Sequence, residues 1–203
     1  KSVGRMMLCH SLFPSGSVRS EYTISRMSDG LFGERFYVVG PGAAHDIDWD
    51  WFMKTVPTDG SVFIRDVTTQ YGVFVLAGPD ARKVLAKLAD ADLSNDAFKW
   101  LTMQEIPVGF ASGVRALRVN FVGSLGWELH HPIEYQNHLY DALMEAGKEF
   151  DIALVGMRAM DSMRLEKTYR LWGTDLNAEN TILEASMNRF VRLNKESFIG
   201  RDA

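Results

Sequence analysis

The residues best suited to chemistry lie in the run 121–130, Phe-Val-Gly-Ser-Leu-Gly-Trp-Glu-Leu-His. Its glycines predict a turn between two strands, and the second strand carries one carboxylate, Glu128, between Trp127 and Leu129. A carboxylate flanked by large apolar residues is costly to desolvate unless it has a partner. Two adjacent N–H donors on a flat heterocycle would supply one, because an ionised carboxylate accepts two parallel hydrogen bonds. These ten residues also leave open a hairpin whose glutamate points into solvent.

A second group of charged residues lies on a helix predicted over 157–167. Asp161 is three residues from both Arg158 and Arg164, so these charges share one helix face and can pair there. Spacing alone favours a salt-bridged helix surface, with the methionines at 157, 160 and 163 in the core. The segment 169–176 that follows is irregular and aromatic, and such loops more often line a cleft than a core.

Metal binding is not favoured by the spacing of the possible ligands. His130 and His131 are adjacent on a predicted strand and therefore point to opposite faces. The other histidines have no carboxylate or cysteine at ligand spacing, so we expect them on the surface or hydrogen-bonded: His10, His45 and His138. Three aspartates alternate with apolar residues but splay too widely on a helix to form a calcium loop: Asp46, Asp48 and Asp50.

The composition is that of an ordinary globular protein. The 203 residues contain 22 Lys and Arg and 26 Asp and Glu, with a formal net charge of −4. The cations are scattered, which argues against a nucleic-acid binder, and no apolar run reaches the roughly 18 residues of a membrane span. The single cysteine, Cys9, excludes a disulfide within the chain and fits a reducing, cytoplasmic-type compartment. We expect one domain over 1–203, a fragment of a longer polypeptide because the chain opens directly in a strand-like run.

Strands and helices are mixed without a regular βαβ repeat, which predicts an antiparallel α+β fold. The first two strands flank a turn with Pro14 and Gly16 and should form a hairpin. Helices are predicted over about 43–54, after Gly78, from Pro132 to Gly147 and over 157–167. Strands are predicted over 3–9, 21–27, 36–39, 62–67, 71–76, 103–109, 114–122 and 152–155.

Four motifs, taken in order, resemble the glycine-cleavage T-protein (aminomethyltransferase) superfamily, and more narrowly the folate-binding part of dimethylglycine and sarcosine dehydrogenases. They are Gly-Ser-Leu-Gly-Trp-Glu-Leu at 123–129, Arg-Ala-Met-Asp-Ser-Met-Arg-Leu-Glu-Lys at 158–167, Trp-Gly-Thr-Asp-Leu at 172–176 and Phe-Ile-Gly-Arg at 198–201. Several motifs together make the resemblance specific. It implies an antiparallel α+β fold around a central folate channel. It also implies a small C-terminal β-barrel beyond residue 203 and a flavin-binding (FAD) domain upstream.

The resemblance implies roles for four residues. Glu128 falls where the family's carboxylate holds the pterin ring. Phe121 falls where many relatives have a tyrosine lining the folate site, and Tyr169 where an aromatic residue near the folate is expected. Glu21 falls where the aminomethyltransferases have an aspartate beside the reacting amine. One extra methylene shifts that charge by about an ångström, so Glu21 indicates a shifted substrate, a rebuilt site or a lost activity. Taken alone, Glu21 also fits an exposed glutamate at a strand edge.

The function implied is transfer of a methylene or methyl unit from an amine such as dimethylglycine or sarcosine to tetrahydrofolate. The donor would reach this chain from an upstream flavin domain. Two alternatives stay open. One is a non-catalytic folate-binding protein of iron–sulfur cluster maintenance, although the cysteine of those proteins is absent from 195–201. The other is a folate-dependent demethylase of a sulfonium or methyl ether donor. The oligomeric state is not indicated.

Overall fold

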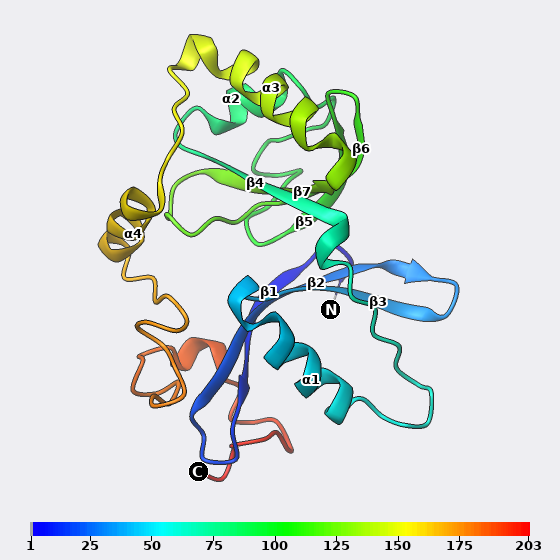
Figure 1. The fold of residues 1–203 in the computed structure, drawn as a ribbon, viewed down its shortest axis with the longest axis vertical. Coiled ribbons are helices and arrows are strands. Elements are labelled where there is room, and N and C mark those ends of the chain that lie inside the picture. The colour runs from blue at the N-terminus through cyan, green and yellow to red at the C-terminus, as the bar shows by residue number, and fades with distance from the viewer. Residues whose placement is uncertain (1) are drawn as a thin grey trace. The chain divides into compact units, whose positions relative to one another are not determined.

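A computed structural model describes residues 2–203 of the chain, which divide into two compact units (Figure 1). Unit one comprises the N-terminal residues through Arg5 together with Val67–Tyr169. Unit two comprises Met6–Asp66 together with Arg170–Ala203. After Arg5 the chain therefore starts unit two, leaves it at Asp66 to build the rest of unit one, and returns at Arg170 to complete unit two. Each unit has its own cluster of buried apolar side chains.

Unit two is built on an antiparallel sheet in the order β1-β2-β3. The strands are β1 (Met6–Leu12), β2 (Val18–Gly30) and β3 (Gly33–Val39), and helix α1 (His45–Thr55) follows them. The predicted hairpin around Gly16 is confirmed, because β1 and β2 pair antiparallel across that turn. The core of this unit brings Val18 of β2 together with Leu176, Ile182 and Met187. The returning C-terminal segment is therefore part of the sheet's packing.

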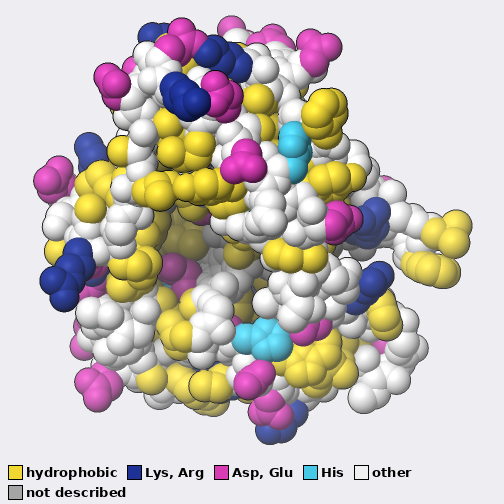
Figure 2. Space-filling model, turned by 45° about the horizontal axis from the view of Figure 1, so that its top comes forward, with side chains coloured by type: hydrophobic (Ala, Val, Ile, Leu, Met, Phe, Trp, Pro, Cys, Tyr) yellow, Lys and Arg dark blue, Asp and Glu magenta, His cyan; other side chains and the backbone are white. Residues whose placement is uncertain are grey.

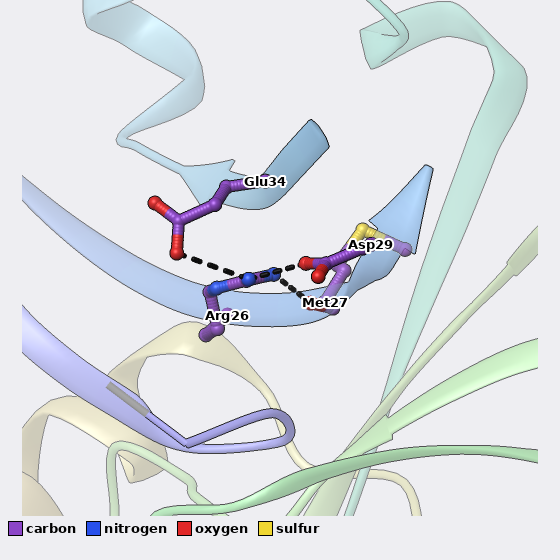
Figure 3. A network of polar contacts seen from close by, with 4 residues as sticks. All are labelled: Arg26, Met27, Asp29 and Glu34. Atoms are coloured by element: carbon purple, nitrogen blue, oxygen red, sulfur yellow. Dashed lines mark hydrogen bonds and ion pairs between the residues drawn. The ribbon is translucent and has the colours of Figure 1, made fainter. Parts of the chain in front are cut away.

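The β2–β3 hairpin is braced by one buried arginine (Figure 3). Arg26 is 6% exposed, and its guanidinium lies between the carboxylates of Asp29 and Glu34 while donating to the carbonyl oxygen of Met27. A buried guanidinium needs such partners because an unpaired buried charge is costly. These contacts link β2 to β3 across their turn through one guanidinium group.

Unit one contains a four-stranded antiparallel sheet in the order β4-β7-β6-β5. The strands are β4 (Tyr71–Ala77), β5 (Met103–Val108), β6 (Ala111–Leu117) and β7 (Gly126–Pro132). The helices are α2 (Ala81–Ala86), α3 (Gln136–Gly147) and α4 (Met157–Glu166). Helices α2 and α3 cover one face of this sheet (Figure 1), and their apolar residues join those of the strands in one core. The antiparallel α+β prediction is confirmed.

Three predicted strands are wrong or too long. Residues 62–67 and 152–155 form no strand, and β6 ends at Leu117 rather than near 122. The apolar side chains responsible for the first two predictions are largely exposed, Phe63 at 88% and Leu154 at 72%. A strand needs a neighbour to pair its backbone groups, and a local apolar run cannot report whether one is available.

Charged side chains of both signs are interspersed on the face drawn in Figure 2, and the Lys and Arg side chains near its top lie beside Asp and Glu. This agrees with their scattered positions in the sequence. Among residues 2–203, no helix is both long and apolar enough to cross a membrane.

Candidate functional site

Glu128 lies at the centre of unit one's sheet, on β7 between β4 and β6. Its register partners are Val75 and Leu117. Successive side chains of a strand point to opposite faces, so its neighbours Trp127 and Leu129 enter the core under α2 and α3, where both are 0% exposed. Glu128 projects from the other face, and 24% of its side chain is exposed. Trp127 and Leu129 therefore do not cover the carboxylate, because the pleat separates them from it.

A histidine two residues further along holds this carboxylate. Nε2 of His130 lies 3.2 Å from Oε2 of Glu128, and His130 is only 2% exposed. The two residues share a face because strand side chains repeat every second residue. This pairing is not among the predictions from the sequence, although the i, i+2 spacing of the two residues on a predicted strand is a visible signal for it. Glu128 is therefore neither free in solvent nor fully enclosed.

The loop before β7 packs against the segment after α4. The rings of Phe121 and Tyr169 lie 6.1 Å apart, so the structure brings together two of the predicted folate-site residues. The loop is folded by Asn120, whose Oδ1 accepts the N–H groups of Val122 and Gly123 at 3.0 and 2.9 Å. Gly123 has a φ of +69°, which favours glycine at this turn. These contacts give the aromatic pair a fixed backbone support.

Arg164 positions Tyr169 from the last turn of α4. Its Nε donates to Oδ1 of Asp161 at 2.7 Å, which confirms the predicted i, i+3 pair. A second guanidinium nitrogen donates to the carbonyl oxygen of Tyr169 at 2.9 Å, and Arg164 is 2% exposed. The helix is thus more than a salt-bridged surface. Its methionines are less buried than predicted, however: Met157 is 73% exposed, so its assignment to the core is wrong.

Glu21, the predicted residue of the reacting centre, lies in unit two on the central strand β2. It stands directly opposite His10 of β1, and His10 Nε2 lies 2.8 Å from Glu21 Oε2. The side chains of His10 and Glu21 are 3% and 17% exposed. The alternative of an exposed glutamate at a strand edge is therefore wrong. Sequence spacing did not reveal this pair, since it depends on the register set by a five-residue connection.

A cavity of about 400 Å³ lies beside β1 within unit two. Its walls include His10 and Cys9 from β1, Trp51 from α1, and Phe190 and Lys195 from the C-terminal segment. Glu21 is not among its lining residues, so His10 borders both the cavity and the carboxylate. No sequence pattern predicted this cavity, because its walls come from segments more than 130 residues apart.

Of the three aspartates of α1, Asp48 serves the packing of unit two. Asp48 is 6% exposed and accepts hydrogen bonds from Ser20 Oγ at 2.9 Å and from the Tyr22 hydroxyl at 2.8 Å. Burial raises the pKa of the Tyr22 hydroxyl, and the Asp48 carboxylate adds to this rise. Within residues 2–203, no group of three or more His, Cys, Asp or Glu residues could hold a metal ion.

Comparison with known proteins identifies the family to which this fold and these residues belong. The sequence model described as "GCVT N-terminal domain" matches residues 1–195. The chain belongs to this family.

Individual proteins of known name are similar to this chain. The chain is 42% identical over 203 residues to the mitochondrial dimethylglycine dehydrogenase of Homo sapiens, covering 99% of the chain and 23% of that protein. It is 34% identical over 174 residues to the aminomethyltransferase of Listeria monocytogenes, covering 84% of the chain and 45% of that protein. The crystal structure of the glycine cleavage system aminomethyltransferase T from Bartonella henselae superposes with a TM-score of 0.79 at 22% identity, covering 99% of the chain and 52% of that protein. The chain therefore spans less than half the length of the dimethylglycine dehydrogenase and of the Listeria aminomethyltransferase, and about half of the Bartonella protein.

Proposed function

We propose that this chain is a folate-binding one-carbon transfer domain. It would receive a methylene or methyl unit from an amine-linked donor such as dimethylglycine or sarcosine. Tetrahydrofolate would supply the nucleophilic nitrogen that accepts this unit, while the chain's own residues bind, orient and provide charge. Membership of the GCVT N-terminal domain family and the likeness to dimethylglycine dehydrogenase and aminomethyltransferase support this proposal.

The carboxylate of Glu128 carries the proposal. It projects from the face of the sheet opposite Trp127 and Leu129, keeps 24% of its side chain exposed, and is oriented by His130. A carboxylate held in this way can accept the paired N–H donors of a reduced pterin. Phe121 and Tyr169 offer flat apolar surface for the ring system, and Phe121 does so without the hydroxyl that a tyrosine would add. The residues of unit one therefore fit the proposed ligand.

Glu21 is the proposed catalytic carboxylate. A negative charge beside the reacting amine would stabilise the cation that develops there and could accept its proton. The side chain of Glu21 is 17% exposed and is therefore not fully enclosed. The flavin that would generate the donor belongs to another part of the polypeptide or to a partner. The cytoplasmic-type compartment stays a prediction.

Binding of 5-formyltetrahydrofolate, measured by isothermal titration calorimetry, tests the proposal. Glu128→Gln keeps the size of the side chain but replaces one acceptor oxygen by a donor. A hydrogen bond to a charged group contributes about 1.5–3 kcal/mol, so the affinity should fall about ten- to hundredfold.

The matched control is Glu134→Gln, which changes an exposed glutamate of the same unit and should bind like wild type. Equal affinities of wild type and Glu128→Gln would refute the assignment of Glu128. Absence of any folate binding by wild type would refute the proposed function.

A further inference from the structure

We propose that His10 is the positioning residue of Glu21. Its imidazole would hold the carboxylate in the orientation needed at the reacting centre without touching the substrate. This inference rests on the proposed function, because it assigns His10 a role through the carboxylate that the function requires.

The geometry of the β1–β2 hairpin brings His10 and Glu21 into contact. His10 and Glu21 are directly opposite each other in the antiparallel register of β1 and β2, so their side chains leave the sheet on the same face. Nε2 of His10 lies 2.8 Å from Oε2 of Glu21. Because the carboxylate can only accept, the imidazole must donate from Nε2. The contact therefore requires a proton on Nε2.

The surroundings hold the imidazole itself in place. The side chain of His10 is 3% exposed, and its ring packs against Phe190 at a centroid distance of 6.0 Å and an interplanar angle of 59°. Phe190 belongs to the C-terminal segment that completes unit two. A nearly buried polar ring needs a hydrogen-bond partner, and Glu21 supplies it. The imidazole is thus a fixed donor rather than a mobile surface group.

A glutamate needs such a donor more than an aspartate does. Its extra methylene adds a rotatable bond, so the carboxylate can occupy more positions and loses more conformational entropy when it is fixed. The bond to His10 engages Oε2, while 17% of the Glu21 side chain remains exposed. His10 can therefore restrict the longer side chain through Oε2 while its bond leaves Oε1 unengaged.

The first test is a structural one that requires no folate. Nitrogen-15 NMR of the histidine side chains should show the Nε2–H tautomer of His10 in wild type. Glu21→Gln should alter the His10 side-chain signals while leaving those of His138, which lies in the other unit, unchanged. A wild-type His10 protonated on Nδ1 alone would overturn the inference, whatever the folate assays give.

The second test is kinetic. Purified wild type and variants receive tetrahydrofolate and the iminium that formaldehyde forms with a large excess of sarcosine, and methylenetetrahydrofolate is quantified by mass spectrometry. His10→Leu keeps much of the side-chain volume but removes the donor. It should lower kcat about ten- to hundredfold, the effect of misplacing a reacting group by about an ångström, with KM for tetrahydrofolate unchanged within about twofold.

A rescuing variant and a double variant distinguish a positioning role of His10 from an effect on folding. His10→Gln restores an N–H donor and should recover kcat to within about threefold of wild type. In a Glu21→Gln background, His10→Leu should cause no further loss, because residues that act as a unit are not additive. Circular dichroism checks the fold of every variant.

Each result either supports or overturns the role proposed for His10. Wild-type kcat in His10→Leu, a His10→Gln variant as slow as His10→Leu, or additive losses in the double variant would overturn the role of His10. Failure of wild type to bind folate or transfer the unit would instead overturn the proposed function, and the role of His10 with it. The NMR result still reports the pair independently.

Discussion

Replacing Arg164 by leucine should release the aromatic part of the proposed folate site. Arg164 is 2% exposed and donates both to Asp161 and to the carbonyl oxygen of Tyr169. Leucine preserves part of the apolar stem but cannot donate. The segment after α4 would then lose the side-chain bond that fixes Tyr169 and, through the ring contact, Phe121.

The magnitude follows from the two bonds. The bond from the buried guanidinium to the Tyr169 carbonyl is charge-assisted and contributes about 1.5–3 kcal/mol. Asp161 is 49% exposed, so the ion pair adds only about 0–1 kcal/mol. We therefore expect the free energy of local opening at Tyr169 to fall by about 2–3 kcal/mol. At 1.4 kcal/mol per factor of ten, this is about a thirty- to hundredfold rise in the open population.

Native-state hydrogen exchange measures this quantity directly, because the N–H of Tyr169 donates to the carbonyl oxygen of Arg164. The amide of Tyr169 should exchange about thirty- to hundredfold faster in Arg164→Leu, while amides of β7 keep their wild-type rates. If the aromatic pair contributes to ligand binding, affinity for 5-formyltetrahydrofolate should fall in parallel.

Arg158→Leu is the matched control, since it makes the same chemical change on an exposed position of the same helix. It should leave the exchange rate of Tyr169 within about twofold of wild type. Equal acceleration in both variants would show that lost helix charge, not the bond to Tyr169, is responsible. Unchanged exchange in Arg164→Leu would refute the positioning role outright.

Two further predictions concern pH. Because Asp48 adds to the raised pKa of Tyr22, Asp48→Asn should bring the Tyr22 pKa down toward its ordinary value of 10.0, measured by absorbance titration; an unchanged pKa would contradict the contact. The carboxylates of Asp46 and Asp66 raise the pKa of His45 above 6.5. The stabilisation that His45 provides is therefore complete below pH 6.5 and lost as the pH rises through its folded-state pKa. The difference in urea midpoint between wild type and His45→Gln should shrink over that rise, and a constant difference would contradict the assignment.

Local patterns in the sequence were sufficient for the elements whose stabilisation is local. The helices after Gly78 and Pro132 were predicted from capping residues and an apolar stripe, and both formed. The hairpin around Gly16 was predicted from turn residues between two strand-like runs. The strand predicted at 62–67 is wrong because pairing is not a local property. The run has strand-like residues but no neighbouring strand to pair with.

The sequence predicted which residues belong to the site but not which side chains contact them. Glu128, Phe121, Tyr169 and Glu21 were selected on a family resemblance. The structure adds a histidine to each carboxylate: His130 to Glu128, and His10 to Glu21. It also joins Phe121 to Tyr169 across 48 positions of sequence. The cavity beside β1 was not predicted at all.

The sequence by itself determined the α+β class, the main helices and hairpins, and the acidic and aromatic residues that are candidates for the site. These depend on interactions within a few residues, namely capping, turn conformation and apolar periodicity. Only the tertiary structure decided that His10 lies opposite Glu21, and that Phe121 meets Tyr169. Strand register and the return of the C-terminal segment decide such contacts. Both are set by long-range packing, whose free energy is gained only when distant segments are buried together.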